Sequence, residues 1–228
     1  MIRLLIVAEG PTEEGFVNQV VAPAFWNRNT WPEPRLIPTS KYGCGGALNW
    51  DRVLRYLRNT LRESAETYVT TFFDLYALHK DFPGVEEATN LADPISRAQL
   101  IEAQFKEAAV AEAGCRADRF LPHIQPYEFE SLLLSDVRRF PEHRSEWKTH
   151  LHQLEEARAA AATPEHINDG PETHPSARLD KLTPRYQKVL DGRRVAELVG
   201  LERMRGECVH FAQWLDRLEA LTPLGARA

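Results

Sequence analysis

The chain has 228 residues, 43% of them hydrophobic and 27% charged, and its formal net charge is −5 at pH 7. This length allows one large domain with a sizeable core, and the acidic balance excludes a general polyanion binder. Three scattered cysteines argue against a disulfide framework. Since no apolar run is long enough to span a bilayer and the N-terminal run fails as a signal peptide, we expect a cytoplasmic protein without membrane contact.

The first part of the chain alternates between strand and helix patterns. Apolar, β-branched or aromatic runs predict strands at 4–8, 35–39, 68–73 and 120–126. Apolar residues at helical spacing predict one helix that begins at an N-cap on Thr12. They predict further helices over 48–61, 96–113 and 129–134. This order predicts an α/β fold with a mostly parallel central sheet flanked by helices.

Strand patterns end at about residue 137, so we expect an α/β core over 1–137 and a helical C-terminal extension over 138–228, packed on the core. Within the extension, the run 142–162 is rich in alanine, glutamate and arginine and predicts one helix. A polar loop over 163–175 and short helices to about residue 221 are expected after it.

Acidic residues follow three of the predicted strands. Glu9 comes after the first strand, Asp74 after the third, and Glu128 and Glu130 after the fourth. In open α/β sheets ligands bind outside the carboxyl ends of the strands, so these carboxylates are expected to face one crevice. Clustered carboxylates repel one another, and protonation or a hard divalent cation such as Mg²⁺ or Mn²⁺ offsets the repulsion. The plainer alternative is a strand-to-helix turn after Glu9, with Glu13 and Glu14 favouring the positive end of the next helix.

Several motifs resemble a known fold. The runs V-A-E-G-P-T-E-E and T-T-F-F-D look like the Toprim fold of topoisomerases, bacterial primases, recombination mediators and nucleases of the overcoming-lysogenisation-defect type. The resemblance is closer to an uncharacterised bacterial Toprim-like family, and it covers nearly the whole chain. Its hallmarks read here E-G-P-T-E, F-D-L-Y-A-L-H-K-D-F-P-G, Q-P-Y-E-F-E-S-L-L and I-N-D-G-P-E-T-H-P-S-A-R-L.

The resemblance implies roles for two acids. Glu9 matches the invariant Toprim glutamate, a general acid/base or metal ligand, and Asp74 matches the first aspartate of the D-x-D metal motif. The second aspartate is replaced by Tyr76, whose protonated phenol is a poor Mg²⁺ ligand. Three alternatives stay open: Asp81, Glu128 or Glu130 supplies the missing oxygen, the site holds a single ion, or catalysis has been lost.

The expected function is that of a Mg²⁺- or Mn²⁺-dependent nuclease, with Glu9 and Asp74 catalytic and Glu128 and Glu130 as further metal ligands. The segment 176–194 is locally basic, so it is either a track for the phosphate backbone or a solvated helix face. Candidate contacts to DNA or RNA are Lys80, Arg178, Lys181 and Lys188. A glycine loop at Gly43, Gly45 and Gly46, with Lys41, is a further candidate phosphate cradle.

The resemblance also implies a partner and a setting, namely bacterial defence with an ATPase of the chromosome-maintenance and recombination class. The chain has no P-loop motif, so such an ATPase would be a separate protein. A non-catalytic module that docks on the ATPase and senses nucleic acid is the main alternative, because the second aspartate is missing. A small-substrate phosphohydrolase is a weaker one, and a homodimer stays open.

Overall fold

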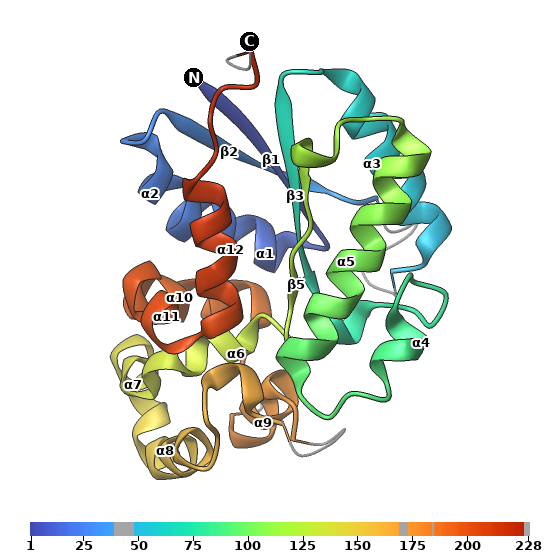
Figure 1. Ribbon diagram of the computed structural model, residues 1–228. Helices are drawn as coiled ribbons and strands as arrows, with labels where there is room; N and C mark the ends of the chain where they lie inside the picture. The colour runs from blue at the N-terminus through green and yellow to red at the C-terminus, as the bar shows by residue number, and fades with distance from the viewer. Residues whose placement is uncertain (39–47, 169–172, 184, 226–228) are drawn as a thin grey trace.

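The computed structural model describes the chain except residues 39–47, 169–172, 184 and 226–228 (Figure 1). A parallel sheet runs through its centre in the order β2-β1-β3-β4, and β5 pairs with the end of β3 beyond β4. The strands are β1 Ile2–Ala8, β2 Thr30–Leu36, β3 Thr67–Asp74, β4 Phe120–Leu121 and β5 Ile124–Gln125. The α/β fold with flanking helices and a helical C-terminal region is confirmed.

Strand β1 is buried on both faces, as its unbroken apolar run predicts. Leu4 and Ile6 belong to the apolar core on one side of the sheet, whereas Leu5 and Val7 belong to the core on the other side. This alternation follows from the two-residue period of a strand. Because both neighbours of β1 run parallel to it, the carboxyl ends of β1 and β3 meet at one edge of the sheet.

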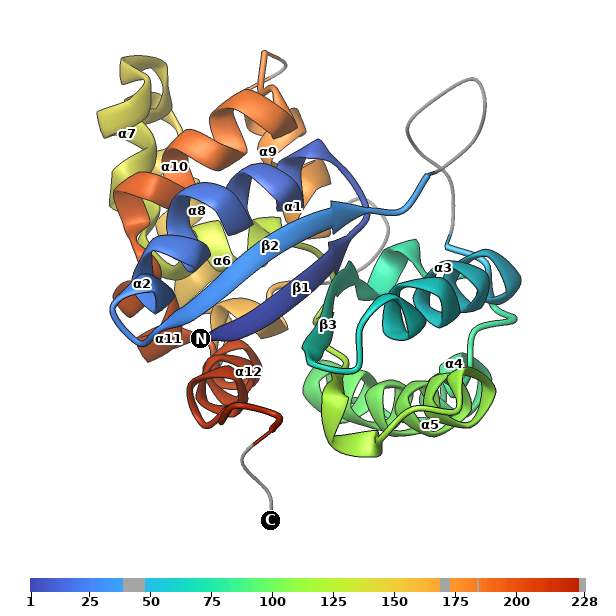
Figure 2. The same cartoon turned by 90° about the horizontal axis from the view of Figure 1, so that it is seen from above.

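Helices cover both faces of the sheet (Figure 2). One face carries α3 Trp50–Glu63, α4 Val85–Ala88 and α5 Pro94–Ala113. The opposite face carries α1 Pro11–Phe16, a π-helical turn Val17–Val21, α2 Ala22–Trp26 and α12 Val209–Glu219. The remaining helices are α6 Glu130–Leu133, α7 Phe140–His143, α8 Leu151–Ala159, α9 Pro175–Leu182, α10 Arg193–Val199 and α11 Leu201–Glu207.

The C-terminal helices share an apolar core with the sheet. Trp214 of α12 packs against Phe72 of β3 with ring centroids 5.4 Å apart. The indole Nε1 of Trp214 also donates a hydrogen bond of 2.9 Å to Thr70 Oγ1, which satisfies its buried polar atom. The contact joins residues 144 positions apart in sequence. A boundary at residue 137 stays a prediction.

Two predicted strands differ from the structure. The second strand spans 30–36 rather than 35–39, and it contains Pro32 and Pro34. Proline is tolerated there because β2 lies at the edge of the sheet, where one side needs no backbone donor. The fourth strand is divided into β4 and β5, with Pro122 and His123 between them.

Two helix predictions are also wrong in detail. The N-cap of α1 is Gly10 rather than Thr12, because Pro11 takes the first helical position that suits its fixed φ. The single helix expected over 142–162 is broken into α7, a 3₁₀ turn and α8. Trp147 in this turn is buried against Phe140, with ring centroids 5.0 Å apart, so burial of an aromatic ring overrides local helix propensity.

No helix of the described residues combines the length and the apolarity that crossing a bilayer requires.

Candidate functional site

The structure places Glu9 and Asp74 side by side at the carboxyl edge of the sheet. Ala8 of β1 is in register with Phe72 of β3, so the chains leave the sheet as neighbours. The backbone N–H of Asp74 donates a hydrogen bond of 2.5 Å to Glu9 Oε1. Two acids separated by 65 positions in sequence therefore meet because their strands pair directly.

A third carboxylate, that of Glu13, reaches the same place from the first turn of α1. Pro11 starts this helix directly after Glu9 and Gly10, and Glu13 is buried. A Cβ atom on Gly10 would lie 3.4 Å from Glu13 Oε2, so the carboxylate folds back over the turn. The sequence interpretation gave Glu13 only a helix-terminus role. Its place as the third residue of a helix that starts at Pro11, from which a glutamate reaches back to the N-cap backbone N–H of Gly10, is the signal that could have found it.

The segment after β5 brings Glu130 to the cluster. The backbone N–H of Phe129 donates a hydrogen bond of 2.8 Å to Asp74 Oδ1, which fixes the start of α6 beside Asp74. Glu130 at that start is fully buried. Its Oε1 atom has no hydrogen-bond partner, and Oε2 is engaged by a lysine ammonium group 3.1 Å away. We call Glu9, Glu13, Asp74 and Glu130 the acidic cluster.

Glu128 lies at the rim of the acidic cluster and is held by α9. Its carboxylate accepts hydrogen bonds from the backbone N–H and the hydroxyl of Ser176, at 2.9 and 3.0 Å. His174 Nδ1 lies 2.9 Å from the same carboxylate. The two acids of Y-E-F-E therefore have different environments, because Glu128 is satisfied by the protein and Glu130 is not.

One lysine stands among these acids. Lys188, in a π-helical turn over Lys188–Gly192, places its Nζ atom 3.1 Å from Glu130 Oε2 and 3.6 Å from Asp74 Oδ2. The turn packs against α1 and lies directly before α10. Among the described residues, the ammonium group of Lys188 thus faces the four carboxylates of the acidic cluster.

Burial and mutual repulsion make ionisation of the acidic cluster unfavourable. Burial is the main cause that raises the pKa of Asp74 to about 6, of Glu13 to about 7 and of Glu130 to about 8. The pKa of Glu9 is raised well above its usual value by burial and by the charges of Asp74 and Glu13. Burial opposes the charge of Lys188, but attraction to Asp74 and Glu130 outweighs it and raises the lysine pKa.

The chemistry of the donors suits a hard divalent cation. They are carboxylate oxygens from three chain segments, which are the ligands that Mg²⁺ and Mn²⁺ prefer. Among the described residues, no three side chains of the acidic cluster bring ligand atoms within 4.8 Å of one another, so a shared ion would have to draw them together. Glu130 Oε1 is buried without a hydrogen-bond partner and has unused acceptor capacity that a cation would satisfy. Lys188 now supplies the positive charge there. Binding of an ion beside Asp74 and Glu130 therefore requires the lysine side chain to turn aside.

Removing that lysine charge is expected to strengthen divalent-ion binding. In Lys188→Met we expect the dissociation constant for Mn²⁺ to fall about tenfold, since the ion no longer displaces or repels an ammonium group. Isothermal titration calorimetry on the chelator-treated protein measures the change. Lys181→Met, a matched loss of charge on α9, should leave the constant unaltered. An equal or weaker affinity in Lys188→Met would show that the lysine does not compete with the ion.

Two other residues named by the sequence lie outside the acidic cluster. Asp81 accepts a hydrogen bond from the Trp50 backbone N–H at 3.3 Å and lies 2.8 Å from His79 Nδ1, so its carboxylate is engaged at the start of α3. Tyr76 is 46% exposed, and its hydroxyl accepts a hydrogen bond from Asn168. Glu130 and Glu13, rather than Asp81, therefore lie beside Asp74 as candidates for the oxygen missing at position 76.

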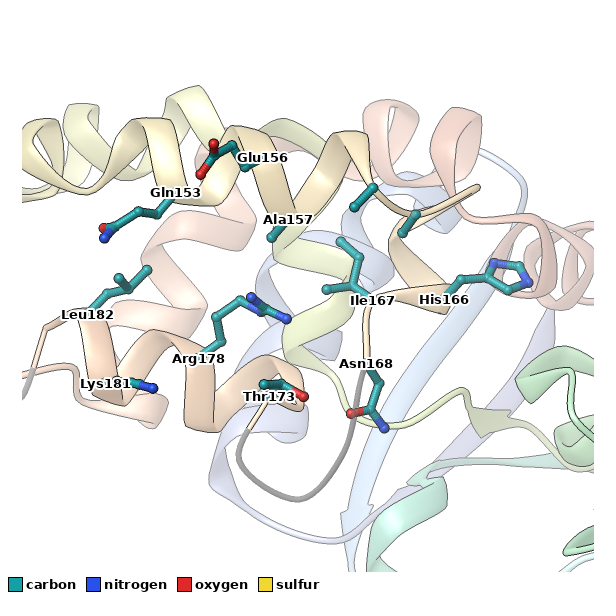
Figure 3. A pocket seen from close by; sticks show the side chains of 12 residues that line it. Gln153, Glu156, Ala157, His166, Ile167, Asn168, Thr173, Arg178, Lys181 and Leu182 are labelled. Atoms are coloured by element: carbon teal, nitrogen blue, oxygen red, sulfur yellow. The ribbon is translucent and has the colours of Figure 1, made fainter.

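The predicted nucleic-acid contacts fall into three places. Arg178 and Lys181 of α9 line a pocket of about 460 Å³ between α8 and α9, whose floor includes Ile167 and Asn168 (Figure 3). Lys188 lies in the acidic cluster, and Lys80 is exposed in the turn after β3. These residues do not form one continuous track. The glycine loop with Lys41, Gly43, Gly45 and Gly46 lies outside the described residues.

A second group of ligating side chains lies where α5, α12 and the segment between β4 and β5 meet. Within the described part of the chain, one group of His, Cys, Asp or Glu has three ligand atoms that all lie within 4.8 Å of one another. It consists of Glu102 of α5, His123 between β4 and β5, and His210 of α12, all buried. This group could hold a metal ion, and no motif in the sequence indicated it.

Comparison with known families assigns the chain. It belongs to the family described as Domain of unknown function (DUF4276), whose model matches residues 8–219. The matched span contains the acidic cluster, Lys188 and the Glu102, His123 and His210 group. No curated protein and no solved structure matches the chain.

Proposed function

We propose that this protein is a Mg²⁺- or Mn²⁺-dependent nuclease of the Toprim type that hydrolyses phosphodiester bonds. The observation that carries the proposal is the convergence of Glu9 and Asp74 from the ends of two paired strands, with Glu13 and Glu130 beside them. The motifs E-G-P-T-E and T-T-F-F-D, at the ends of these strands, support the Toprim relationship.

Asp74, Glu130 and Glu9 have distinct parts in this proposed reaction. Asp74 and Glu130 are the ligands of the ion, which when bound activates water and stabilises charge on the phosphoryl group. Glu9, whose pKa burial raises well above its usual value, accepts and relays the proton of the attacking water. Its Oε1 is held at 2.5 Å by the Asp74 backbone N–H, so the carboxylate keeps its orientation.

The pocket on α9 is the proposed place for the phosphate backbone. Arg178 and Lys181 supply positive charge there, and phosphate contacts of this kind position a nucleic acid without reading its sequence. The pocket and the rim of the acidic cluster share helix α9, because Ser176 at the start of this helix hydrogen bonds Glu128. A strand that follows α9 from the pocket would approach Asp74.

A non-catalytic module that docks on an ATPase and senses nucleic acid is the second candidate. One observation favours it: Lys188 already places a positive charge 3.1 Å from Glu130 and 3.6 Å from Asp74, so the site is partly compensated without a metal ion. In either case the ATPase, of the chromosome-maintenance and recombination class, would be a separate protein that acts with this one in bacterial defence.

The test is a cleavage assay on the purified full-length protein. We expect nicking of supercoiled DNA, or cleavage of RNA, in the presence of Mg²⁺ or Mn²⁺ and loss of both with excess chelator. Phosphate release from free nucleotides with no cleavage of polynucleotide would identify a small-substrate phosphohydrolase instead. Absence of any cleavage, together with no divalent-ion binding at millimolar concentration and co-purification with an ATPase, would favour the non-catalytic module.

A further inference from the structure

The group formed by Glu102, His123 and His210 joins three separate parts of the fold. Glu102 lies on α5, which covers one face of the sheet, whereas His210 lies on α12, which covers the other. His123 lies between β4 and β5 at the edge of the sheet. All three side chains are buried, and Glu102 Oε1 is 2.7 Å from His210 Nε2 and 3.4 Å from His123 Nδ1.

The hydrogen bonds around His123 fix which of its ring nitrogens carries the proton. Gln125 donates through its Nε2 atom to Ser131 Oγ at 3.1 Å, and its side chain also hydrogen bonds the carboxylate of Glu165. The amide oxygen of Gln125 is thereby left to face His123 Nε2 at 3.3 Å. An amide oxygen only accepts hydrogen bonds, so His123 Nε2 must donate to it.

The other ring nitrogen of His123, Nδ1, then carries a lone pair that faces an acceptor. A neutral imidazole has one N–H, so Nδ1 of His123 is unprotonated where it approaches Glu102 Oε1. The buried Nδ1 atom has no hydrogen-bond partner. Nδ1 of His123 is thus a buried acceptor without a donor, and it faces an oxygen that itself accepts from the Ile124 backbone N–H at 2.9 Å, which is costly for the imidazole unless a cation lies between them.

We infer that Glu102 Oε1, His123 Nδ1 and His210 Nε2 bind one transition-metal ion, with Zn²⁺ as the favoured ion. Two imidazole nitrogens and one carboxylate oxygen are a zinc ligand set with one further position. Ligands about 2.0–2.1 Å from a tetrahedral ion lie roughly 3.3 Å apart, which matches the 3.4 Å between Glu102 and His123. To ligate the ion, His210 would shift back by about half an ångström, and the proton by which its Nε2 now hydrogen bonds Glu102 Oε1 at 2.7 Å would be released, as metal binding to histidine requires.

The surroundings of the group suit a metal site. Gln125 accepts the remaining N–H of His123, as a carbonyl oxygen commonly does for a metal-bound histidine. Arg217 holds the other oxygen of Glu102, with both terminal nitrogens 3.3 Å from Oε2, and the backbone N–H of Ile124 donates to Oε1 at 2.9 Å, so the carboxylate is fixed with Oε1 toward the two histidines. A pocket of about 260 Å³, lined in part by Glu102, Pro122 and Arg217, approaches the group from the side of Glu102.

The ion would tie the C-terminal helix α12 to α5 and to the edge of the sheet. This role is independent of phosphodiester cleavage, because it joins helices on opposite faces rather than the carboxyl ends of β1 and β3. We therefore expect the chelator-treated protein to unfold at a lower temperature. Adding one equivalent of Zn²⁺ should raise the midpoint by on the order of 5–10 °C.

The test is zinc binding by the full-length protein, stripped with chelator and titrated against a chromophoric competitor. We expect one tight equivalent, with affinity reduced roughly 100-fold or more in His123→Gln and in His210→Gln. The exposed His152→Gln should bind as the wild type does, which excludes adventitious histidine binding. Asp74→Asn should also retain the equivalent, which separates this site from the acidic cluster.

A second measurement keeps the inference testable if the histidine variants fail to fold. Cobalt(II) added to the stripped wild-type protein should give the strong visible absorption of a tetrahedral site, and Zn²⁺ should abolish it. Wild-type protein that shows neither a zinc-dependent thermal shift nor cobalt absorption would overturn the inference. Equal zinc affinity in folded His123→Gln or His210→Gln would do the same.

Discussion

Replacing Asp74 by asparagine is expected to reduce phosphodiester cleavage by roughly a thousandfold or more, because a metal ligand at the centre of the site is lost. Asp74 accepts the backbone N–H of Phe129, lies beside Glu9 and faces Lys188. Asparagine keeps an acceptor for Phe129 but cannot supply the negative charge. The fold should persist, since the substitution removes a charge whose ionisation burial opposes.

The measurement compares initial rates of plasmid nicking at a fixed Mg²⁺ concentration. Glu9→Gln should lose activity to a similar degree, because its carboxylate is the proposed proton acceptor. Asp81→Asn is the matched control, since this aspartate follows the same strand but contacts Trp50 and His79 instead. Cleavage that survives both Asp74→Asn and Glu9→Gln would exclude these residues from catalysis.

Without divalent ions, the protein is expected to lose stability as the pH rises from about 4.5 to 8. The pKa of Glu130 is raised by burial from 4.5 to about 8, and that of Glu13 to about 7. Between the unfolded and the folded pKa, the folded state keeps a proton that the unfolded state releases, so rising pH favours unfolding. Glu130 alone accounts for a loss on the order of 5 kcal/mol once the pH exceeds its folded pKa.

Urea denaturation at a series of pH values measures this loss. Glu130→Gln should flatten the decline and be the more stable protein at pH 8, because the buried carboxylate is gone. Glu86→Gln, an exposed substitution on α4, should keep the wild-type slope. Saturating Mg²⁺ should also flatten the wild-type decline, since the ion binds the ionised acids. A wild-type stability that rises between pH 4.5 and 8 would contradict the raised pKa values.

The sheet and three members of the acidic cluster, Glu9, Asp74 and Glu130, could be predicted from the sequence for a physical reason. The buried run 4–8 and the aromatic run 68–73 are confirmed as neighbouring parallel strands, within β1 and β3. Parallel strands end at the same edge of a sheet, so Glu9 and Asp74 had to be close if the two strands paired. The inference needed only local patterns and one rule of topology.

The burial of Glu13 and the place of Lys188 depend on how neighbouring elements start and pack. Lys188 is brought to Glu130 by the packing of a π-helical turn against α1, and the basic segment around it predicts a phosphate track equally well. Glu13 is buried because Pro11 starts the helix one step earlier than the expected cap at Thr12. Both residues follow from tertiary packing, which overrides position in the sequence.

The group of Glu102, His123 and His210 could not be predicted from the sequence, because tertiary packing also brings it together. Its members are separated by 21 and 87 positions, the differences between 102, 123 and 210, and lie on elements that cover opposite faces of the sheet. A histidine on a predicted strand is more often a satisfied core residue than a ligand. Only the side-chain geometry around Gln125 reveals that His123 directs an unprotonated nitrogen at a carboxylate.

The most direct test of a cation held by carboxylates from separate strand ends is a crystal soaked in Mn²⁺, examined by anomalous scattering. We expect a manganese peak about 2.1 Å from an oxygen of Asp74, with Glu9 or Glu130 completing its protein ligands and Lys188 turned away. No manganese beside Asp74 at millimolar concentration, with Lys188 still in contact with Glu130, would contradict the proposed site.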